Sequence, residues 1–423
     1  MQRVAEWNAG VTYLRVSAAA ILFFASGCAA PSSPPGRADL LILDARVVTA
    51  TGDVLDRASV VVSDGEIQDV VVGEVDLAAS TVIRGDDYTV VPGLIDTHVR
   101  LLTKSPRVDS DTAMTTYLDE TLPGLLDEYL AAGFTTVLSN GDFWPAAADV
   151  KALVNSGAVR GPRLFILGPV LTAPGAPQAT TMCGDDPWCR NHIVVEVDDE
   201  QQAREAVDQI AEAGADGIKI VYDSDWDNPR FGPGFVRAVV DRATAHDLPV
   251  MMETHKPADV GDALGAGVSR FVHTPRERMP DALTERVAAS SVPVATTLSS
   301  SGPFWGWPES PTFESRKANV SALVASGAPV AFGTGNAGDR SVSAALAAEM
   351  DALQQARLTP EQVLAALTAD AADYLGWSED LGTIEIGKRA DLLIVKGDPL
   401  ADLDALMNVV VVIKDGALIV DYR

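Results

Sequence analysis

Four side chains that could bind a metal ion or transfer a proton lie in four separate strand-like runs: His98, Lys219, His255 and His273. Imidazole nitrogens bind zinc and similar borderline ions. Burial lowers the pKa of a lysine, and its neutral amine can add carbon dioxide to form a carbamate, an oxygen ligand for divalent ions. Such a site would polarise a carbonyl group and activate water. The alternative is a buried Lys219 paired with an acidic neighbour such as Glu253.

The middle of the chain, residues 92–377, predicts the elements that position these side chains. Strand-like runs alternate there with amphipathic helices, such as the one expected over 201–213, a pattern typical of parallel βα units. The strand candidates are 91–98, 135–139, 163–167, 217–222, 249–255, 270–273, 293–298 and 329–333. Eight such units predict an α/β fold of the (β/α)8 TIM-barrel class, with its active site at the carboxyl ends of the strands. The four side chains fall at those ends.

Both ends of the exported domain are rich in short β runs and turn dipeptides such as Asp64-Gly65 and Asp415-Gly416. We expect residues 38–91 and 378–423 to form the two halves of one small β-sandwich, with the barrel inserted between them.

The N-terminal residues have the zones of a secretory signal. Arg3 and Arg15 precede an apolar run, small residues and Cys28, and a Pro/Ser-rich stretch follows. The pattern predicts a signal peptide over 1–27 and a lipid-anchored linker over 28–37, with Cys28 as the lipid acceptor. An uncleaved anchor or a mis-assigned start codon is the alternative. The prediction places the protein in the bacterial cell envelope, at the periplasm or outer surface.

The other two cysteines, Cys183 and Cys189, lie close together in a Gly/Pro-rich region. In an oxidising compartment such a pair forms a disulfide that pins the loop. Metal binding by the pair is the alternative, although the spacing is wider than in the usual Cys-x-x-Cys.

The chain of 423 residues is 47% hydrophobic and carries a net charge of −27. An acidic surface repels nucleic acid phosphates and anionic lipid headgroups, so nucleic acid is excluded as a partner and membrane contact is expected only through the lipid. No oligomeric state is predicted.

Several motifs together resemble the amidohydrolase superfamily, in its imidazolonepropionase-like and Xaa-Pro dipeptidase-like branch. They are Val91 to Arg100, Gly161 to Leu164, Gly214 to Lys219 and Gly382 to Val395. The resemblance implies a hydrolase of amide-type C–N bonds that uses metal-activated water. It also implies that Lys219 is the carboxylated lysine that bridges two metals. His255 and His273 would bind the metal on their side of the barrel, and His98 would be the surviving half of a His-x-His pair.

Two residues depart from the family pattern on one side of this site. Arg100 replaces the second histidine of His-x-His, and Gly335 replaces the aspartate of Gly-Thr-Asp. Neither can bind a metal, because a guanidinium has no usable lone pair and glycine has no side chain. We therefore expect one divalent metal, zinc, or none, with the Arg100 guanidinium taking the vacated charge position. Asp339, Glu253 and Asp96 are the candidate general bases.

Two functions remain open from the sequence. In the first, the protein hydrolyses a small amide, dipeptide or cyclic amide, with Lys219, Arg100 and Asp339 as catalytic residues and Trp305 and Trp307 as an apolar pocket wall. In the second, it is a catalytically inactive, surface-tethered ligand-binding lipoprotein.

Overall fold

The computed structural model describes residues 37–73, 75–102, 108–176, 183–222, 232–302, 310–336, 338 and 340–423. The predictions for Cys28, Trp305, Trp307 and Asp339 lie outside these residues. Within them, no helix combines the length and apolar character needed to cross a membrane.

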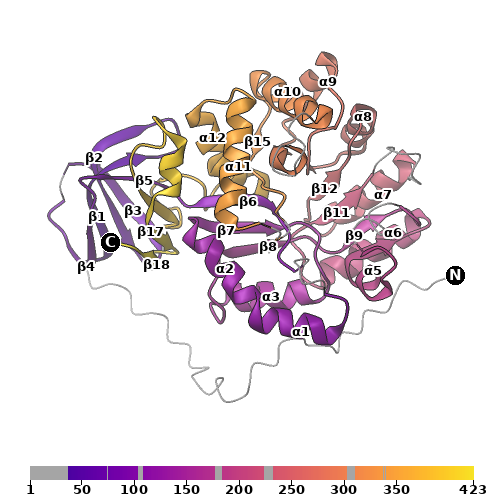
Figure 1. The fold of residues 1–423 in the computed structure, drawn as a ribbon, viewed down its shortest axis with the longest axis horizontal. Coiled ribbons are helices and arrows are strands. Elements are labelled where there is room, and N and C mark those ends of the chain that lie inside the picture. The colour runs from indigo at the N-terminus through magenta and orange to yellow at the C-terminus, as the bar shows by residue number, and fades with distance from the viewer. Residues whose placement is uncertain are drawn as a thin grey trace.

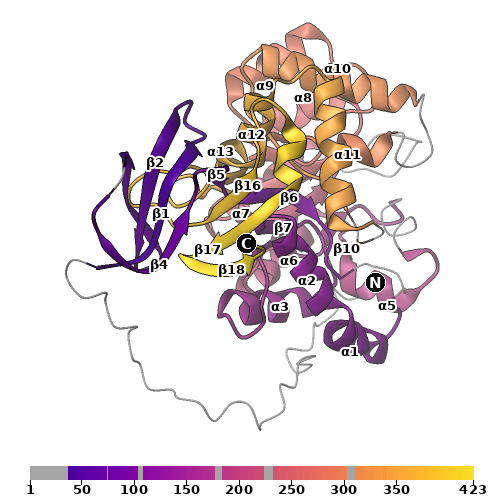
Figure 2. The same ribbon diagram turned by 60° about the vertical axis from the view of Figure 1, so that its left-hand side comes forward.

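Strands from both ends of the chain form one eight-stranded sheet, in the order β18-β17-β16-β5-β1-β2-β3 with β4 beside β1. Figures 1 and 2 show the indigo N-terminal strands beside the yellow C-terminal ones. Buried side chains from both sets form one core. The strands are β1 Arg37–Val48, β2 Val54–Ser63, β3 Glu66–Val72, β4 Ala78–Arg84, β5 Tyr88–Pro92, β16 Leu392–Lys396, β17 Val409–Lys414 and β18 Ala417–Asp421. The predicted joining of the two ends is therefore present as a shared sheet.

The middle of the chain contains two parallel sheets, β6-β7-β8 and β10-β9-β11-β12-β13-β14-β15. Their strands are β6 Leu94–Val99, β7 Phe134–Ser139, β8 Arg163–Ile166, β9 Val170–Thr172, β10 Val194–Glu196, β11 Ile218–Val221, β12 Val250–Glu253, β13 Arg270–Phe271, β14 Val294–Ala295 and β15 Val330–Ala331. All pairings in these two sheets are parallel. This is the arrangement expected from alternating strands and helices.

Backbone hydrogen bonds connect the two parallel sheets in two places. Thr97 N–H donates to Phe332 O (3.0 Å) and Arg100 N–H donates to Asn336 O (2.9 Å), which joins β6 to the segment after β15. Asp216 N–H donates to Ile166 O (2.8 Å) beside a bridge from Leu167 to Gly217, which joins β8 to the start of β11. The first and last predicted strands of the middle region are therefore neighbours in space.

The helices lie outside the parallel strands (Figure 1). They are α1 Asp111–Glu120, α2 Leu122–Ala131, α3 Ala146–Asn155, α5 Pro187–Ile193, α6 Glu200–Glu212, α7 Pro233–Thr244, α8 Pro257–Ala266, α9 Asp281–Ser290, α10 Pro311–Ala325, α11 Val342–Gln355, α12 Pro360–Leu367 and α13 Ala369–Leu375, with 3-10 helices η2 Leu298–Ser301 and η4 Leu403–Met407. Helix α6 buries Ala203, Val207 and Ile210 as its spacing predicts. Helix α12 begins with the Thr359 and Gln362 capping box.

Several strands are shorter than the sequence predicts. The run expected over 91–98 is two strands, β5 and β6, divided at Gly93, whose missing side chain makes room for Thr135 of β7. β12 ends at Glu253 and β13 at Phe271, so His255 and His273 each lie two residues beyond their strand. β14 ends at Ala295. The backbone turns away there because Thr297 adopts a left-handed conformation (φ +46°) and η2 begins.

Cys183 and Cys189 are joined by a disulfide, with their Cα atoms 5.4 Å apart. Both cysteines are buried. Cys189 belongs to α5, whose first turn is capped by the Asp186 carboxylate. The disulfide therefore links Cys183, which precedes α5, to Cys189 within that helix.

Candidate active site

A buried ion pair lies at the carboxyl ends of β11 and β12. Lys219 Nζ is 2.9 Å from Glu253 Oε2, and it also donates a hydrogen bond to the backbone oxygen of Asn140 (3.3 Å). The Lys219 side chain is fully buried, and that of Glu253 is 10% exposed. The neighbouring strands bring the two together because Lys219 pairs with Met251 and Val221 with Glu253 in the parallel register.

Three histidines surround this ion pair. His255 Nε2 is 3.9 Å from Glu253 Oε1, and His273 Nε2 is 3.9 Å from Glu253 Oε2. The His98 and His273 rings are 4.9 Å apart, and the His255 and His273 rings 6.1 Å. The structure therefore brings all four predicted ligand residues, His98, Lys219, His255 and His273, around one carboxylate.

The charges of the cluster depend on its burial. Burial lowers the pKa of Lys219 to about 8, with Glu253 opposing the shift and Arg100 adding to it. Burial would raise the pKa of Glu253, but nearby positive charge, chiefly Lys219, holds it well below its usual range. Burial also lowers the pKa of His98 and His273, so both imidazoles are neutral near pH 7. At that pH the pair consists of an ammonium and a carboxylate.

Arg100 lies at the end of β6, half-buried beside this cluster. Its guanidinium is close enough to lower the pKa of His98, Lys219 and Glu253. Gly335 lies across from it, with its backbone N–H donating to His98 O (2.9 Å). A Cβ on Gly335 would meet Ser300 Cβ at 3.2 Å, and φ is +64°. Arg100 therefore adds a fixed cation to this part of the site, and Gly335 adds no carboxylate.

Three buried carboxylates hold the loops that carry the site. Asp142 accepts from the backbone N–H groups of Leu101 (2.7 Å) and Leu102 (3.1 Å) after β6. Glu349 of α11 accepts from Leu298 (2.8 Å) and Ser299 (2.7 Å) in η2.

Asp96 accepts from the Thr334 hydroxyl (2.6 Å) and from the backbone N–H groups of His98 (3.0 Å) and Thr334 (3.1 Å). Burial raises the pKa of Asp96 to about 7. These hydrogen bonds fix the backbone around His98 and Thr334.

Sequence reasoning missed Asn140, Asp142, Arg316 and Glu349. Arg316 is buried and its charge acts on His273. A signal was available for the two helical residues, because each occupies the apolar stripe of its helix. Arg316 follows Phe313 and precedes Val320 and Leu323 in α10, and Glu349 follows Ala345 and Leu346 in α11. A charge on a buried stripe needs a partner, so it points to a site or a network.

The side chains as arranged do not fit a metal centre. Lys219 binds Glu253 as an ammonium, whereas a carbamate would place a second negative group beside that carboxylate. Arg100 and Gly335 provide no ligand. Among the residues that the structure describes, no three His, Cys, Asp or Glu side chains are grouped so that they could hold one metal ion. The metal and the carboxylated Lys219 stay predictions.

A model of the amidohydrolase family matches residues 89–419, about four fifths of the chain. The chain belongs to the amidohydrolase family. The family resemblance inferred from the sequence motifs is thereby confirmed, including its imidazolonepropionase-like branch.

Similar proteins include two bacterial imidazolonepropionases and one solved dipeptidase. The Caulobacter vibrioides (strain NA1000 / CB15N) enzyme is 33% identical over 182 residues, which span 43% of this chain and 43% of that protein. The Stenotrophomonas maltophilia (strain R551-3) enzyme is 25% identical over 86% of this chain and 93% of its own length. A crystal structure of a Xaa-Pro dipeptidase with bound methionine in its active site has a TM-score of 0.77 and 26% identity, covering 90% of this chain and 99% of that one.

We predict that Lys219→Met destabilises the fold by about 3–5 kcal/mol, because it leaves the buried Glu253 carboxylate without its ammonium partner. The double variant Lys219→Met/Glu253→Gln should lose less, since neither charge remains. Urea unfolding followed by circular dichroism measures both.

The matched control is Arg160→Met, which removes an ion pair to Asp127 whose two side chains are each 52% exposed. It should cost about 1 kcal/mol or less. A double variant as damaged as Lys219→Met would contradict the pairing.

Proposed function

We propose that this protein is a hydrolase of amide-type C–N bonds in a small amide, a dipeptide or a cyclic amide. The observation that carries the proposal is the cluster of Lys219, Glu253 and three histidines at the carboxyl ends of parallel strands. Chemistry in this architecture takes place at those ends. The imidazolonepropionase and dipeptidase relatives act on C–N bonds, which supports the same reaction class here.

The closed form of the fold is part of the proposal. A (β/α)8 barrel is supported by the hydrogen bonds between β6 and the segment after β15. It is also supported by a buried apolar cluster that contains residues of β6, β7, β8, β12, β14 and β15. We propose likewise that the shared terminal sheet folds into a sandwich, since Ile67 N–H of β3 donates to Lys388 O, ahead of β16 (2.8 Å).

The side chains offer two of the groups that amide hydrolysis needs. Lys219 Nζ can donate to the carbonyl oxygen and stabilise the negative charge that develops on it. The Glu253 carboxylate or a neutral imidazole can accept a proton from water. Asp339 stays a candidate general base. The family resemblance predicts one zinc-like ion or none, and the ion pair of Lys219 with Glu253 favours the version without a metal.

A second candidate function is ligand binding without turnover. It is favoured by Gly335, which lacks the carboxylate that moves the proton of water in the family pattern. The protein would then keep the pocket and bind a small molecule at the cell surface.

Turnover of a panel of dipeptides, N-acyl amino acids and cyclic amides by the purified full chain tests these functions. A hydrolase should release amine product, and Glu253→Gln should lower kcat/KM by about 10²–10⁴-fold if the carboxylate transfers the proton. The matched control is Arg278→Gln, an exposed residue away from the cluster, which should leave kcat/KM unchanged.

An inert parent would contradict the hydrolase proposal. The binding function would then be supported if Arg100→His/Gly335→Asp, which returns both family residues, is active. Aspartate is among the residues that tolerate the positive φ of Gly335.

We also propose that the chain is exported and lipid-anchored through Cys28 in the cell envelope. The charged, apolar and small-residue zones before Cys28 support this. The chain should sediment with membranes and show the added mass of the lipid, and Cys28→Ser should release it unmodified. If parent and Cys28→Ser were released from the membranes to the same extent, the result would contradict the proposed lipid anchor at Cys28.

A further inference from the structure

Two polar side chains beside the cluster, those of Asn140 and Arg100, have buried donor atoms without a partner among the described residues. Asn140 follows β7 and is fully buried, and neither its Nδ2 nor its Oδ1 forms a hydrogen bond with a described residue. Arg100 Nε is also buried and without a partner. The backbone N–H of Asn140 donates to Val99 O (2.8 Å), which places Asn140 beside the residue that precedes Arg100. The two donors therefore belong to neighbouring strand ends.

The great majority of buried amide and guanidinium groups in proteins are paired, so an unpaired one calls for a partner such as a water, an ion or a ligand. The missing partner must accept hydrogen bonds, because Nε of Arg100 and Nδ2 of Asn140 both donate. An acceptor that carries negative charge would form charge-assisted bonds with the guanidinium, which are the stronger kind.

The carboxylates already present near Arg100 are engaged elsewhere. Glu253 forms an ion pair with Lys219, whose Nζ is 2.9 Å from Oε2, although that oxygen accepts no hydrogen bond of regular geometry from a described residue. Asp142 accepts from the Ser139 hydroxyl and from the backbone N–H groups of Leu101 and Leu102. Among the described residues Arg100 makes one hydrogen bond, from its backbone N–H to Asn336. Its positive charge is therefore not matched by an ion pair in the described part of the chain.

We infer that Arg100 and Asn140 hold the carboxylate group of the substrate, on the side of the site where family members place a metal ligand histidine. The inference rests on the proposed function, because it assigns the substrate class of that same site. Nε of Arg100 and Nδ2 of Asn140 donate to the carboxylate oxygens. Oδ1 of Asn140 accepts an N–H, so an N-acyl amino acid, which carries both a carboxylate and an amide N–H, fits this pair.

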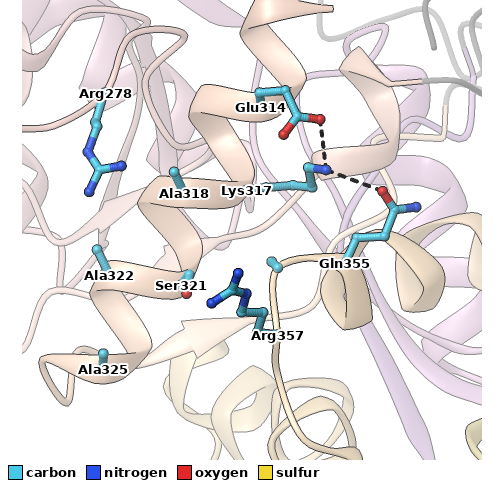
Figure 3. Close-up of a pocket in the computed structure, with 10 residues that line it drawn as sticks. Arg278, Glu314, Lys317, Ala318, Ser321, Ala322, Ala325, Gln355 and Arg357 are labelled. Atoms are coloured by element: carbon cyan, nitrogen blue, oxygen red, sulfur yellow. Dashed lines mark hydrogen bonds and ion pairs between the residues drawn. The ribbon is translucent and has the colours of Figure 1, made fainter. Parts of the chain in front are cut away.

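A surface cavity of about 440 Å³ between α10 and the end of α11 is the competing place for an anion. Figure 3 shows Arg278, Lys317 and Arg357 around it. Lys317 is already bound by Glu314 (2.8 Å) and Gln355 (3.3 Å). The two exposed arginines, Arg278 and Arg357, therefore supply matched control variants.

The test is an NMR titration of the full chain with propionate labelled with ¹³C at its carboxyl group, and propionamide serves as the neutral probe of the same shape. Propionate should bind and propionamide should not. Arg100→Gln and Asn140→Asp should each weaken propionate binding at least tenfold, since one loses the cation and the other replaces the donor with a like charge. Arg357→Gln and Arg278→Gln should change it less than twofold. Circular dichroism melting curves verify that each variant is folded.

Equal binding by the parent and a folded Arg100→Gln would overturn the inference. So would loss of binding in Arg357→Gln, which would place the anion in the surface cavity, or no binding of propionate by the folded parent. The titration needs no turnover, so it separates the two proposals. Propionate binding by a parent that hydrolyses no amide would leave this inference standing and contradict the hydrolase proposal. Unchanged turnover of N-acyl amino acids by Arg100→Gln would contradict this inference and leave the hydrolase proposal standing.

Discussion

The ion pair between Lys219 and Glu253 determines what the centre of this protein can bind. Two opposite charges in a buried position stabilise each other and are costly to separate. While the ammonium of Lys219 is held by Glu253 at 2.9 Å, its nitrogen has no lone pair to react with carbon dioxide. Arg100 adds a second cation that would repel a divalent ion. The same residues leave a positively charged side on which an anion can be held.

The surrounding loops keep this cluster in place through buried carboxylates. Asp142 fixes the backbone after β6, and Glu349 fixes η2 after β14. Asp96 ties His98 to Thr334 across β6 and the segment after β15. Each carboxylate accepts from backbone N–H groups, so burial does not leave it unsatisfied. His98, Lys219 and Glu253 therefore lie on regular strands, and the loops after β6 and β14 are fixed by side chains from neighbouring elements.

The sequence predicted the positions of the strands and several helices because their patterns are local. The apolar runs at 135–139 and 163–167 and the capping box at Thr359 needed no knowledge of distant residues. Strand ends were less accurate, since the backbone after β12, β13 and β14 turns into loops that carry polar residues.

The sequence named Glu253 as the alternative partner of Lys219, but it could not decide between that ion pair and a carbamate on Lys219. The choice depends on the register of β11 with β12, which brings Glu253 to Lys219 from 34 positions along the chain. Arg316 and Glu349 lie on helices distant in sequence, so their place on an apolar stripe predicts that they are buried but not which residues they contact.

Metal content and mass of the full chain test this account most directly. The protein would be purified without chelators and with bicarbonate present, and intact mass would be recorded under native conditions. The account predicts well below one zinc-like ion per chain and no added mass of carbon dioxide on Lys219. About one ion per chain together with that added mass, both lost in Lys219→Ala, would contradict it.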